Sequence, residues 1–149
     1  MKLCSYSANG KAGYGIVADN GIIALGERYR DSTTLRHFLD NHGVGEAQKL
    51  TGEPADLQLN DVTLKPVITD PDKIVCVGLN YHDHIKETGR TLSEQPVLFP
   101  RYAASQVGHG EAMVKPLESD KFDYEGELAV IIGTGGRRIS EGDALKHIA

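Results

Sequence analysis

The chain has 149 residues, of which 40% are hydrophobic and 25% charged, a composition typical of a globular protein with one ordinary core. Lysine and arginine total 16 against 21 acidic residues, so the net charge of -5 gives no basic excess to neutralise nucleic-acid phosphates. The two cysteines form no metal or disulfide pattern, and no apolar stretch reaches the roughly 18 residues of a membrane span. We therefore expect a cytoplasmic protein that binds neither nucleic acid nor membrane.

Short antiparallel strands are the first elements expected, within residues 2–25. Asn-Gly dipeptides at residues 9–10 and 20–21 interrupt this stretch, and they favour hairpin turns because Asn and Gly tolerate positive φ. Helical spacing begins after Ser32 or Thr33, either of which can act as the N-cap, and an Asn-His-Gly run ends the helix. The N-terminal segment is therefore predicted to be a small β-meander followed by a short amphipathic helix.

A boundary is expected near residue 70. A possible strand at residues 62–67 leads into a Thr-Asp-Pro-Asp run at residues 69–72, and such runs are typical of turns and joints. We therefore divide the chain into a small N-terminal segment, residues 1–70, and the first part of a main domain, residues 71–149.

The main domain is expected to be rich in strands. Residues 73–78 are mostly apolar and β-branched, which predicts a buried strand, and residues 80–87 then have a helical composition. Ser140 and Asp143 have the spacing of a capping box that would open a last helix. Further strands are expected at residues 97–99, 112–114 and 124–133. The fold class predicted is β-rich α+β.

Three carboxylates alternate at the start of the last expected strand: Asp123, Glu125 and Glu127. In an extended strand such residues lie on one face, about 7 Å apart in successive pairs. A hard cation with oxygen ligands would neutralise this anionic face. The alternative is an ordinary solvent-facing strand, which the spacing alone favours.

His84 and Glu87 stand three positions apart in the expected helix and so share one of its faces. A carboxylate can orient an imidazole and raise its basicity, and such a pair can act as a general base. His82 would point elsewhere on the helix and is the weaker candidate. The alternative for His84 and Glu87 is a surface ion pair, the commoner role of such a pair on an exposed helix.

Three polar residues follow the expected strand at residues 97–99: Arg101, Tyr102 and Ser105. Arginine is suited to bidentate capture of a substrate carboxylate, and a serine hydroxyl can bind an oxo or enolate oxygen. Arg101 is equally able to pair with a surface acid. The glycines on either side of His109 indicate a tight loop, because the motif order of a phosphate-binding loop is absent.

Four ordered stretches together resemble the opening of the catalytic domain of the fumarylacetoacetate hydrolase family. They are KIVCVGLNYHDHIKETG at residues 73–89, PVLF at 96–99, FDYEGELAVIIG at 122–133 and ISEGDAL at 139–145. The resemblance covers about half of the chain, and the N-terminal meander and helix are similar to a small segment that many members carry ahead of that domain. The resemblance implies the family's catalytic fold, incomplete in this chain.

The resemblance also implies the residues of an active site. Family members hold Mg²⁺ or a similar ion, such as Mn²⁺ or Ca²⁺, through two glutamates and a later aspartate, which implies Glu125 and Glu127 as ligands. Their water-activating dyad implies His84 and Glu87. The substrate implied is a small oxo acid, whose enolate the metal would stabilise. Members commonly form homodimers, and we expect the same of an intact domain.

Several hypotheses about the activity follow from this resemblance. The leading one is a metal-dependent hydrolase that cleaves a C–C bond in acylpyruvate-like or fumarylacetoacetate-like acids. Relatives also hydrate, isomerise or decarboxylate related oxo acids. Two further alternatives are a catalytically inactive truncated remnant and a non-enzymatic module that binds a metal or small ligand.

Two features depart from the family pattern. Arg101 stands where many members have lysine, and arginine keeps the positive charge but cannot act as an acid. The family's third metal ligand follows the helix in which this chain stops. We therefore expect the chain to be the N-terminal portion of the enzyme, with weak metal binding.

Overall fold

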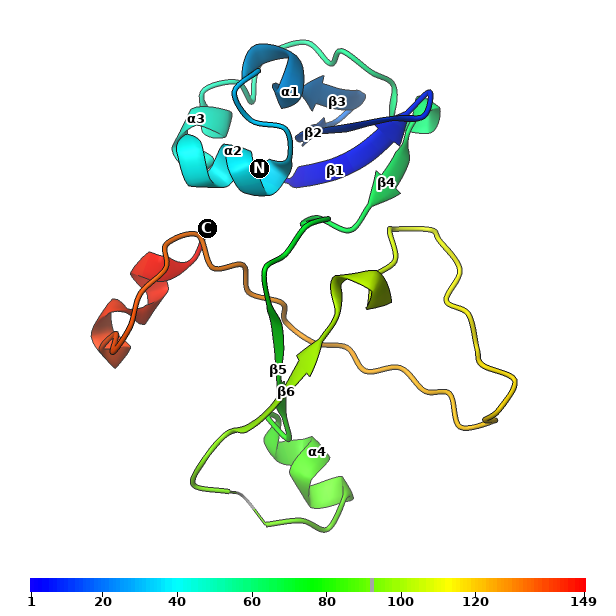
Figure 1. Cartoon of the computed structure of the whole chain (residues 1–149), viewed down its shortest axis with the longest axis vertical. Coiled ribbons are helices and arrows are strands. Elements are labelled where there is room, and N and C mark those ends of the chain that lie inside the picture. The colour runs from blue at the N-terminus through cyan, green and yellow to red at the C-terminus, as the bar shows by residue number, and fades with distance from the viewer. Residues whose placement is uncertain (92) are drawn as a thin grey trace. The chain divides into compact units, whose positions relative to one another are not determined.

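The computed structural model of the chain describes residues 1–91 and 93–149 (Figure 1). They form two compact units, one of residues 1–69 with 107–149 and the other of residues 70–106. Strands outnumber α-helices in the mixed fold, as the β-rich α+β class predicts. Among the described residues, no helix is long and apolar enough to cross a membrane.

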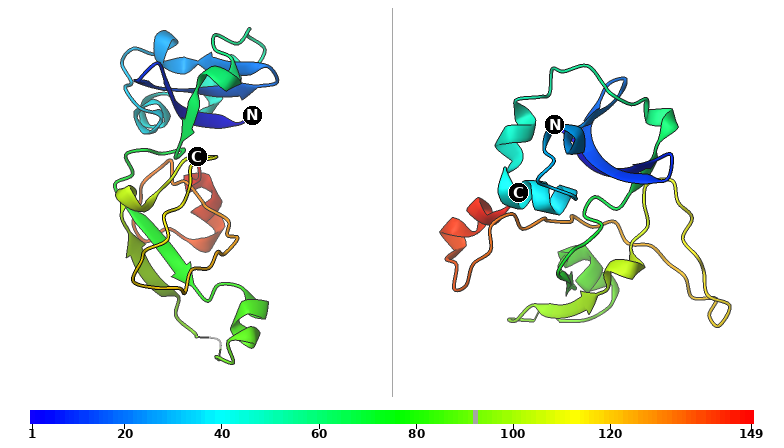
Figure 2. Two further views of the ribbon diagram at one scale, coloured as in Figure 1. Left: turned by 90° about the vertical axis from the view of Figure 1, so that its right-hand side faces the viewer. Right: turned by 45° about the horizontal axis from the view of Figure 1, so that its top comes forward.

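A four-stranded antiparallel sheet lies at the centre of the first unit (Figures 1 and 2). Its strands are β1 (Leu3–Ala8), β2 (Lys11–Ala18), β3 (Gly21–Ala24) and β4 (Thr63–Lys65), in the order β3-β2-β1-β4. Asn9 and Gly10 join β1 to β2 with φ angles of 50° and 76°, which fit a tight hairpin turn. The predicted meander is confirmed.

The core of the first unit lies on both faces of this sheet. Neighbouring strand residues alternate between the faces, so Ile22 packs on one side and Ile23 on the other. Helices α1 (Leu25–Arg28), α2 (Leu35–Asn41) and α3 (Val44–Gln48) lie between β3 and β4 in the chain. The larger cluster consists of Tyr14, Ile16, Ile23, Leu25, Leu35, Phe38 and Ala47, and the smaller of Cys4, Tyr6 and Ile22. The larger cluster therefore joins the sheet to the helices.

The N-cap of helix α2 lies one residue after the later of the two caps considered from the sequence. Thr34 is the N-cap, and its Oγ1 accepts a hydrogen bond of 3.2 Å from the backbone N–H of His37. Ser32 is instead buried in the loop before the helix. The predicted helix is confirmed, with its cap shifted.

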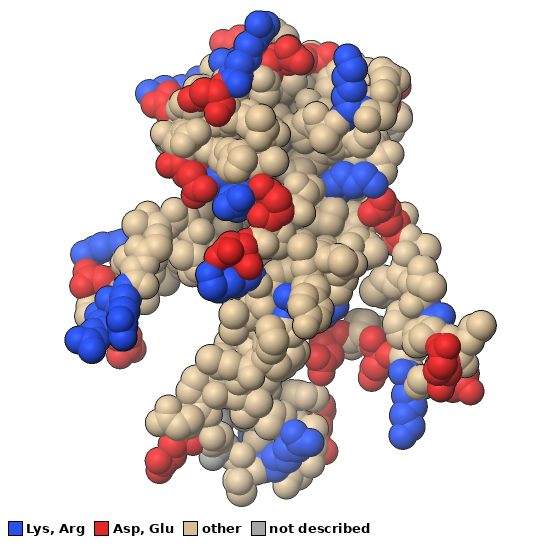
Figure 3. Space-filling model, in the orientation of Figure 1, with Lys and Arg blue, Asp and Glu red and all other residues tan. Residues whose placement is uncertain are grey.

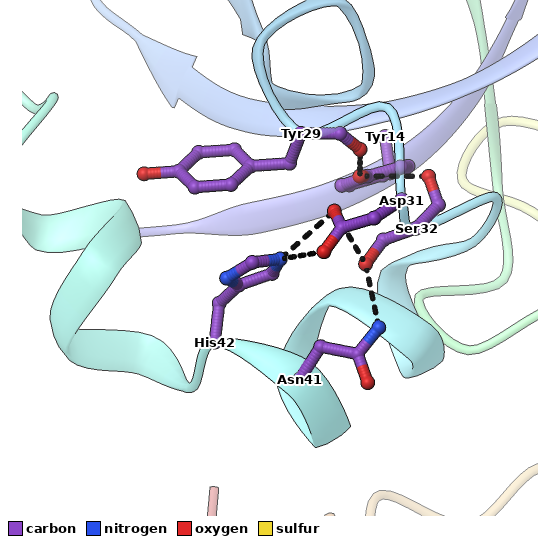
Figure 4. Close-up of polar contacts among 6 residues, drawn as sticks. All are labelled: Tyr14, Tyr29, Asp31, Ser32, Asn41 and His42. Carbon is purple, nitrogen blue, oxygen red and sulfur yellow. Dashed lines mark hydrogen bonds and ion pairs between the residues drawn. The ribbon is translucent and has the colours of Figure 1, made fainter.

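A polar cluster fastens the C-terminal end of α2 to that loop (Figure 4). The buried Tyr14 hydroxyl lies 3.1 Å from the carbonyl oxygen of Ser32, to which it donates. Asn41 Nδ2 donates to Ser32 Oγ at 3.1 Å, and His42 Nε2 lies 3.0 Å from both Asp31 carboxylate oxygens. The helix is therefore held by side-chain hydrogen bonds as well as by its apolar face.

The second unit is a two-stranded antiparallel ribbon with one short helix (Figure 1). Strand β5 (Ile74–Gly78) pairs with β6 (Val97–Arg101), and α4 (His82–Glu87) follows β5. A 3₁₀ turn, η2 (Ala103–Ser105), comes directly after β6. The predicted strand, helix and strand are confirmed in this order. The burial predicted for the first strand is wrong, because Val75 and Val77 of β5 are 57% and 37% exposed.

Two predicted strands are wrong. Residues 112–114 and 124–131 belong to no helix or strand, and beyond them Ile132 makes only an isolated bridge to Ile148. An apolar, β-branched run favours extended backbone, but a strand also needs a neighbour to complete its hydrogen-bond ladder. Leu128, within the second of these stretches, is 82% exposed.

The last predicted helix is a 3₁₀ helix, η3 (Glu141–His147). The expected capping box does not form, because Ser140 Oγ donates to the Asp143 carboxylate at 2.6 Å rather than accepting from the backbone. A further 3₁₀ turn, η1 (Leu59–Asp61), precedes β4. The division at residue 70 stays a prediction.

Candidate functional site

The end of β5 is the best-defined candidate position in the second unit. Leu79, the residue after the strand, has a φ of 54°, which is uncommon for a bulky side chain. Such a conformation costs about 1 to 3 kcal/mol and is often found at functional sites. This backbone bend directs the chain from the strand into α4, which carries the predicted dyad.

His84 and Glu87 lie on one face of α4, as their spacing predicts. His84 Nδ1 is 4.0 Å from Glu87 Oε2, and 43% of the His84 side chain is exposed. This distance is too long for a hydrogen bond but close enough for an ion pair when the imidazole is protonated. Both side chains are partly exposed, so solvent and small molecules can reach the pair.

The C-terminus of α4 is fixed by a Schellman motif. Arg90 N–H donates to the Ile85 carbonyl at 3.3 Å, and Gly89 N–H donates to the Lys86 carbonyl at 3.1 Å. Gly89 has a φ of 65°, the left-handed conformation that this motif requires. Ile85 is buried and anchors the opposite face of the helix. The last turn of α4, which carries Glu87, is thus held by the buried Ile85 side chain and by the two backbone hydrogen bonds of the motif.

Arg101 and Ser105 come together at the end of β6. Arg101 Nε donates to Ser105 Oγ at 3.3 Å, and Ser105 Oγ donates to the Tyr102 carbonyl at 2.7 Å. The Tyr102 ring is 81% exposed. This turn therefore presents a guanidinium and an aromatic ring at the surface.

Glu125 and Glu127 lie in the first unit, in the stretch that forms no strand, and both are exposed. Their oxygens suit a hard cation such as Mg²⁺. Within residues 1–91 and 93–149, however, no three His, Cys, Asp or Glu side chains gather as a site for a metal ion. The carboxylate oxygens of these two residues are suitable ligands for a divalent cation, but no third ligand residue gathers with them among the described residues.

An ion pair that the sequence did not indicate fixes the loop after η2. Lys65 Nζ lies 2.5 Å from Glu111 Oε1, while Glu111 Oε2 accepts a hydrogen bond of 2.6 Å from Gly108 N–H. The Lys65 ammonium and this N–H hold the pKa of the Glu111 carboxyl below its usual range. A groove of about 320 Å³ lies beside it and is lined in part by His109. Lys65 and Glu111 are 46 positions apart, so local spacing gave no signal.

Charged side chains of both signs are interspersed on the face shown in Figure 3. The exposed pairs include Lys49 with Glu46 and Lys115 with Asp120. Exposed pairs of this kind contribute little stability, because water screens the attraction and two long side chains lose freedom in forming it.

The family-model comparison decides the affiliation of this chain. The model described as the C-terminal part of fumarylacetoacetate (FAA) hydrolase matches residues 73–149, which include the His84 and Glu87 pair, Arg101 and both glutamates. The chain belongs to the fumarylacetoacetate hydrolase family. The predicted resemblance is confirmed, and the matched region begins three residues after the expected boundary at residue 70.

The chain is similar to enzymes that act on an oxo acid. It is 41% identical to the mitochondrial oxaloacetate tautomerase FAHD2A of Bos taurus, over all of this chain and 50% of that protein. It is 38% identical to the enzyme of the same name from Homo sapiens, over 78% of this chain and 38% of that protein. The chain therefore spans about half, or less, of the length of the curated relatives it matches.

A solved structure supports the fold. The crystal structure of an HpcE-type protein from Mycobacterium smegmatis matches 99% of this chain and 52% of its own chain, with a TM-score of 0.73 and 23% identity. This likeness confirms the fold predicted for the family.

Proposed function

We propose that this chain carries the proton-transfer part of an enzyme that acts on small oxo acids and interconverts the keto and enol forms of oxaloacetate. The relatives named oxaloacetate tautomerase support the substrate and the reaction. The observation that carries the proposal is the position of His84 beside Glu87 on the exposed face of α4.

The proposed reaction needs one base that takes and returns a proton. His84 removes a proton from the CH₂ carbon of keto-oxaloacetate. The C–H electron pair forms the C=C bond, and the carbonyl π pair moves onto oxygen to leave an enolate. Glu87 stabilises the imidazolium formed. Return of the proton to the enolate oxygen gives the enol and restores the neutral imidazole. Atoms and charge balance, because the proton moves from carbon to oxygen while a C–C π bond replaces the C–O π bond and no σ bond other than C–H is broken.

Arg101 is proposed to bind a carboxylate of the substrate. Its planar guanidinium has the donor geometry for a two-point hydrogen bond to a carboxylate. Tyr102, exposed beside it, is proposed to cover the bound acid. The sequence also predicts Ser105 as a residue that binds the substrate.

Glu125 and Glu127 are proposed to donate carboxylate oxygens to a divalent cation, Mg²⁺ or alternatively Mn²⁺ or Ca²⁺. Such an ion would polarise the oxo group and stabilise negative charge on its oxygen. The carboxylate oxygens of the two glutamates are the kind of donor that these ions take, although no third His, Cys, Asp or Glu gathers with them among the described residues.

The second candidate is C–C bond cleavage in an acylpyruvate-like acid, the hydrolase predicted from the family resemblance. The same pair supports it, because an imidazole beside a carboxylate can also activate water. Two assays distinguish the reactions. Tautomerisation is followed as loss of the enol form of oxaloacetate, and cleavage is followed as release of two acids from an acylpyruvate.

The decisive experiment compares His84→Ala with His82→Ala, a matched change on the same helix. The measured quantity is the rate of oxaloacetate tautomerisation after the uncatalysed rate has been subtracted. We expect His84→Ala to lower this rate by about 100-fold or more, because a base has been removed. His82→Ala should stay within about twofold of the unchanged chain. Equal rates in both variants would remove His84 from the reaction.

A further inference from the structure

The Ser105 hydroxyl is already used by two neighbours in its own turn. Its proton is donated to the Tyr102 carbonyl at 2.7 Å, and its oxygen accepts Arg101 Nε–H at 3.3 Å. The backbone N–H of Ser105 donates to the same Tyr102 carbonyl at 2.9 Å. A hydroxyl has one proton to give, so Ser105 has no donor left for a substrate oxygen.

The Arg101 guanidinium is held at one end only. Its Nε is bonded to Ser105, whereas its two terminal nitrogens make no hydrogen bond or ion pair to any described residue. Those terminal nitrogens, together or with Nε, form the fork that captures a carboxylate in two-point geometry. The serine therefore restrains the side chain without occupying the donors that a ligand needs.

The short turn after β6 fixes the position of Ser105 relative to Arg101. Arg101 is the last residue of β6, and Ser105 is the last residue of η2, which begins two residues later. The backbone and side-chain bonds to the Tyr102 carbonyl place Ser105 Oγ relative to the strand end. An arginine side chain loses considerable rotational freedom on binding, and a contact formed beforehand reduces that loss.

We infer that Ser105 is a positioning residue that holds the Arg101 guanidinium ready for a substrate carboxylate, and that it does not bind the substrate itself. This inference rests on the proposed function for the role of Arg101. It replaces the sequence-based prediction that Ser105 is a substrate ligand. A variant that keeps the hydroxyl should therefore keep the affinity, even with an added methyl group.

The first test is a measurement on the side chain that needs no turnover. Hydrogen exchange of the Arg101 Nε–H, followed by ¹⁵N NMR on the whole chain, should accelerate severalfold in Ser105→Ala. It should remain near its original rate in Ser105→Thr. Ser93→Ala is the matched control, because Ser93 is an exposed serine of the same unit that accepts from Gln95 N–H instead. Unchanged exchange in Ser105→Ala would overturn the inference.

The second test separates binding from chemistry with oxaloacetate as substrate. Ser105→Ala should raise KM roughly fivefold with kcat unchanged, because one restrained side chain becomes mobile. Ser105→Thr should restore KM, and Ser93→Ala should not change it. A loss of kcat with KM unchanged, or a Ser105→Thr variant as weak as Ser105→Ala, would contradict a positioning role. If the unchanged chain turns over no oxo acid, the proposed function fails, and the exchange measurement alone decides whether Ser105 holds Arg101.

Discussion

Tyr14 shows how one side chain can serve both the core and a polar network. Its ring packs against Phe38 with 5.8 Å between ring centroids, and its hydroxyl lies 3.2 Å from the Tyr29 carbonyl and 3.1 Å from that of Ser32. Burial, with a smaller contribution from the charge of Asp31, raises the Tyr14 pKa to about 12. The sequence predicts an apolar strand position here but not these partners, because they are backbone atoms 15 and 18 residues away.

Replacing Tyr14 by Phe should lower the free energy of unfolding by about 1 to 3 kcal/mol, because the buried carbonyl of Ser32 loses its donor. The matched control is Tyr6→Phe, since Tyr6 is also buried but its hydroxyl makes no hydrogen bond to any described residue. Urea denaturation at neutral pH measures both. Equal losses in the two variants would show that the hydrogen bonds of Tyr14 contribute nothing.

The raised Tyr14 pKa also predicts an alkaline dependence. Above the ordinary value of 10.0 the unfolded chain loses this proton, whereas the folded chain keeps it up to about 12. The unfolded state therefore binds fewer protons in this window, and stability falls as pH rises through it. Tyr14→Phe should flatten this decline in denaturation curves recorded between those two pH values, and an unchanged slope would argue against the assignment.

Elements whose turn or cap residues lie within their own stretch of sequence were predictable. The hairpin of β1 and β2 has its Asn-Gly turn, and α4 ends at the glycine its Schellman motif requires. The stretch of residues 124–133 has an equally clear apolar pattern but forms no strand. A strand needs a second segment to pair with, and the sequence of one segment does not show whether such a partner lies beside it. For the same reason the dyad, formed within one helix, was predictable, whereas the Lys65 and Glu111 pair was not.

Gly89→Ala should destabilise the end of α4 by about 1 to 2 kcal/mol. An added Cβ would meet no atom within 4 Å, so the effect would come only from the left-handed φ of 65°. Gly52→Ala is the matched control, because its Cβ would also meet nothing and its backbone is not left-handed. Hydrogen exchange of the Arg90 amide, which bonds to Ile85, measures the change. Equal exchange in the two variants would mean that the motif does not hold the helix end.

Across the whole molecule, order is unevenly distributed along the chain. Both hydrophobic clusters of buried residues are built from segments before residue 50, whereas Val114, Leu117 and Leu128 are more than 80% exposed. The stretch that carries both candidate metal ligands lies outside every helix and strand. The first unit therefore has a well-formed core in its N-terminal part and a loosely bonded part that contains Glu125 and Glu127. Homodimer formation stays a prediction for the intact domain.

This distribution predicts a specific pattern of amide hydrogen exchange. Amides of β1 and β2 should be protected by close to the full free energy of unfolding, and those of residues 112–131 should exchange near their intrinsic rates, because no helix or strand includes them. Mg²⁺ with oxalate, a mimic of the chelating oxo-acid head, should slow exchange at residues 123–127 if the two glutamates bind the ion. Glu125→Gln should abolish that slowing, while Glu118→Gln, an exposed glutamate of the same stretch, should leave it intact. Slowing that survives Glu125→Gln would remove this residue from the metal site, and slowing lost in both variants would indicate attraction to net charge alone.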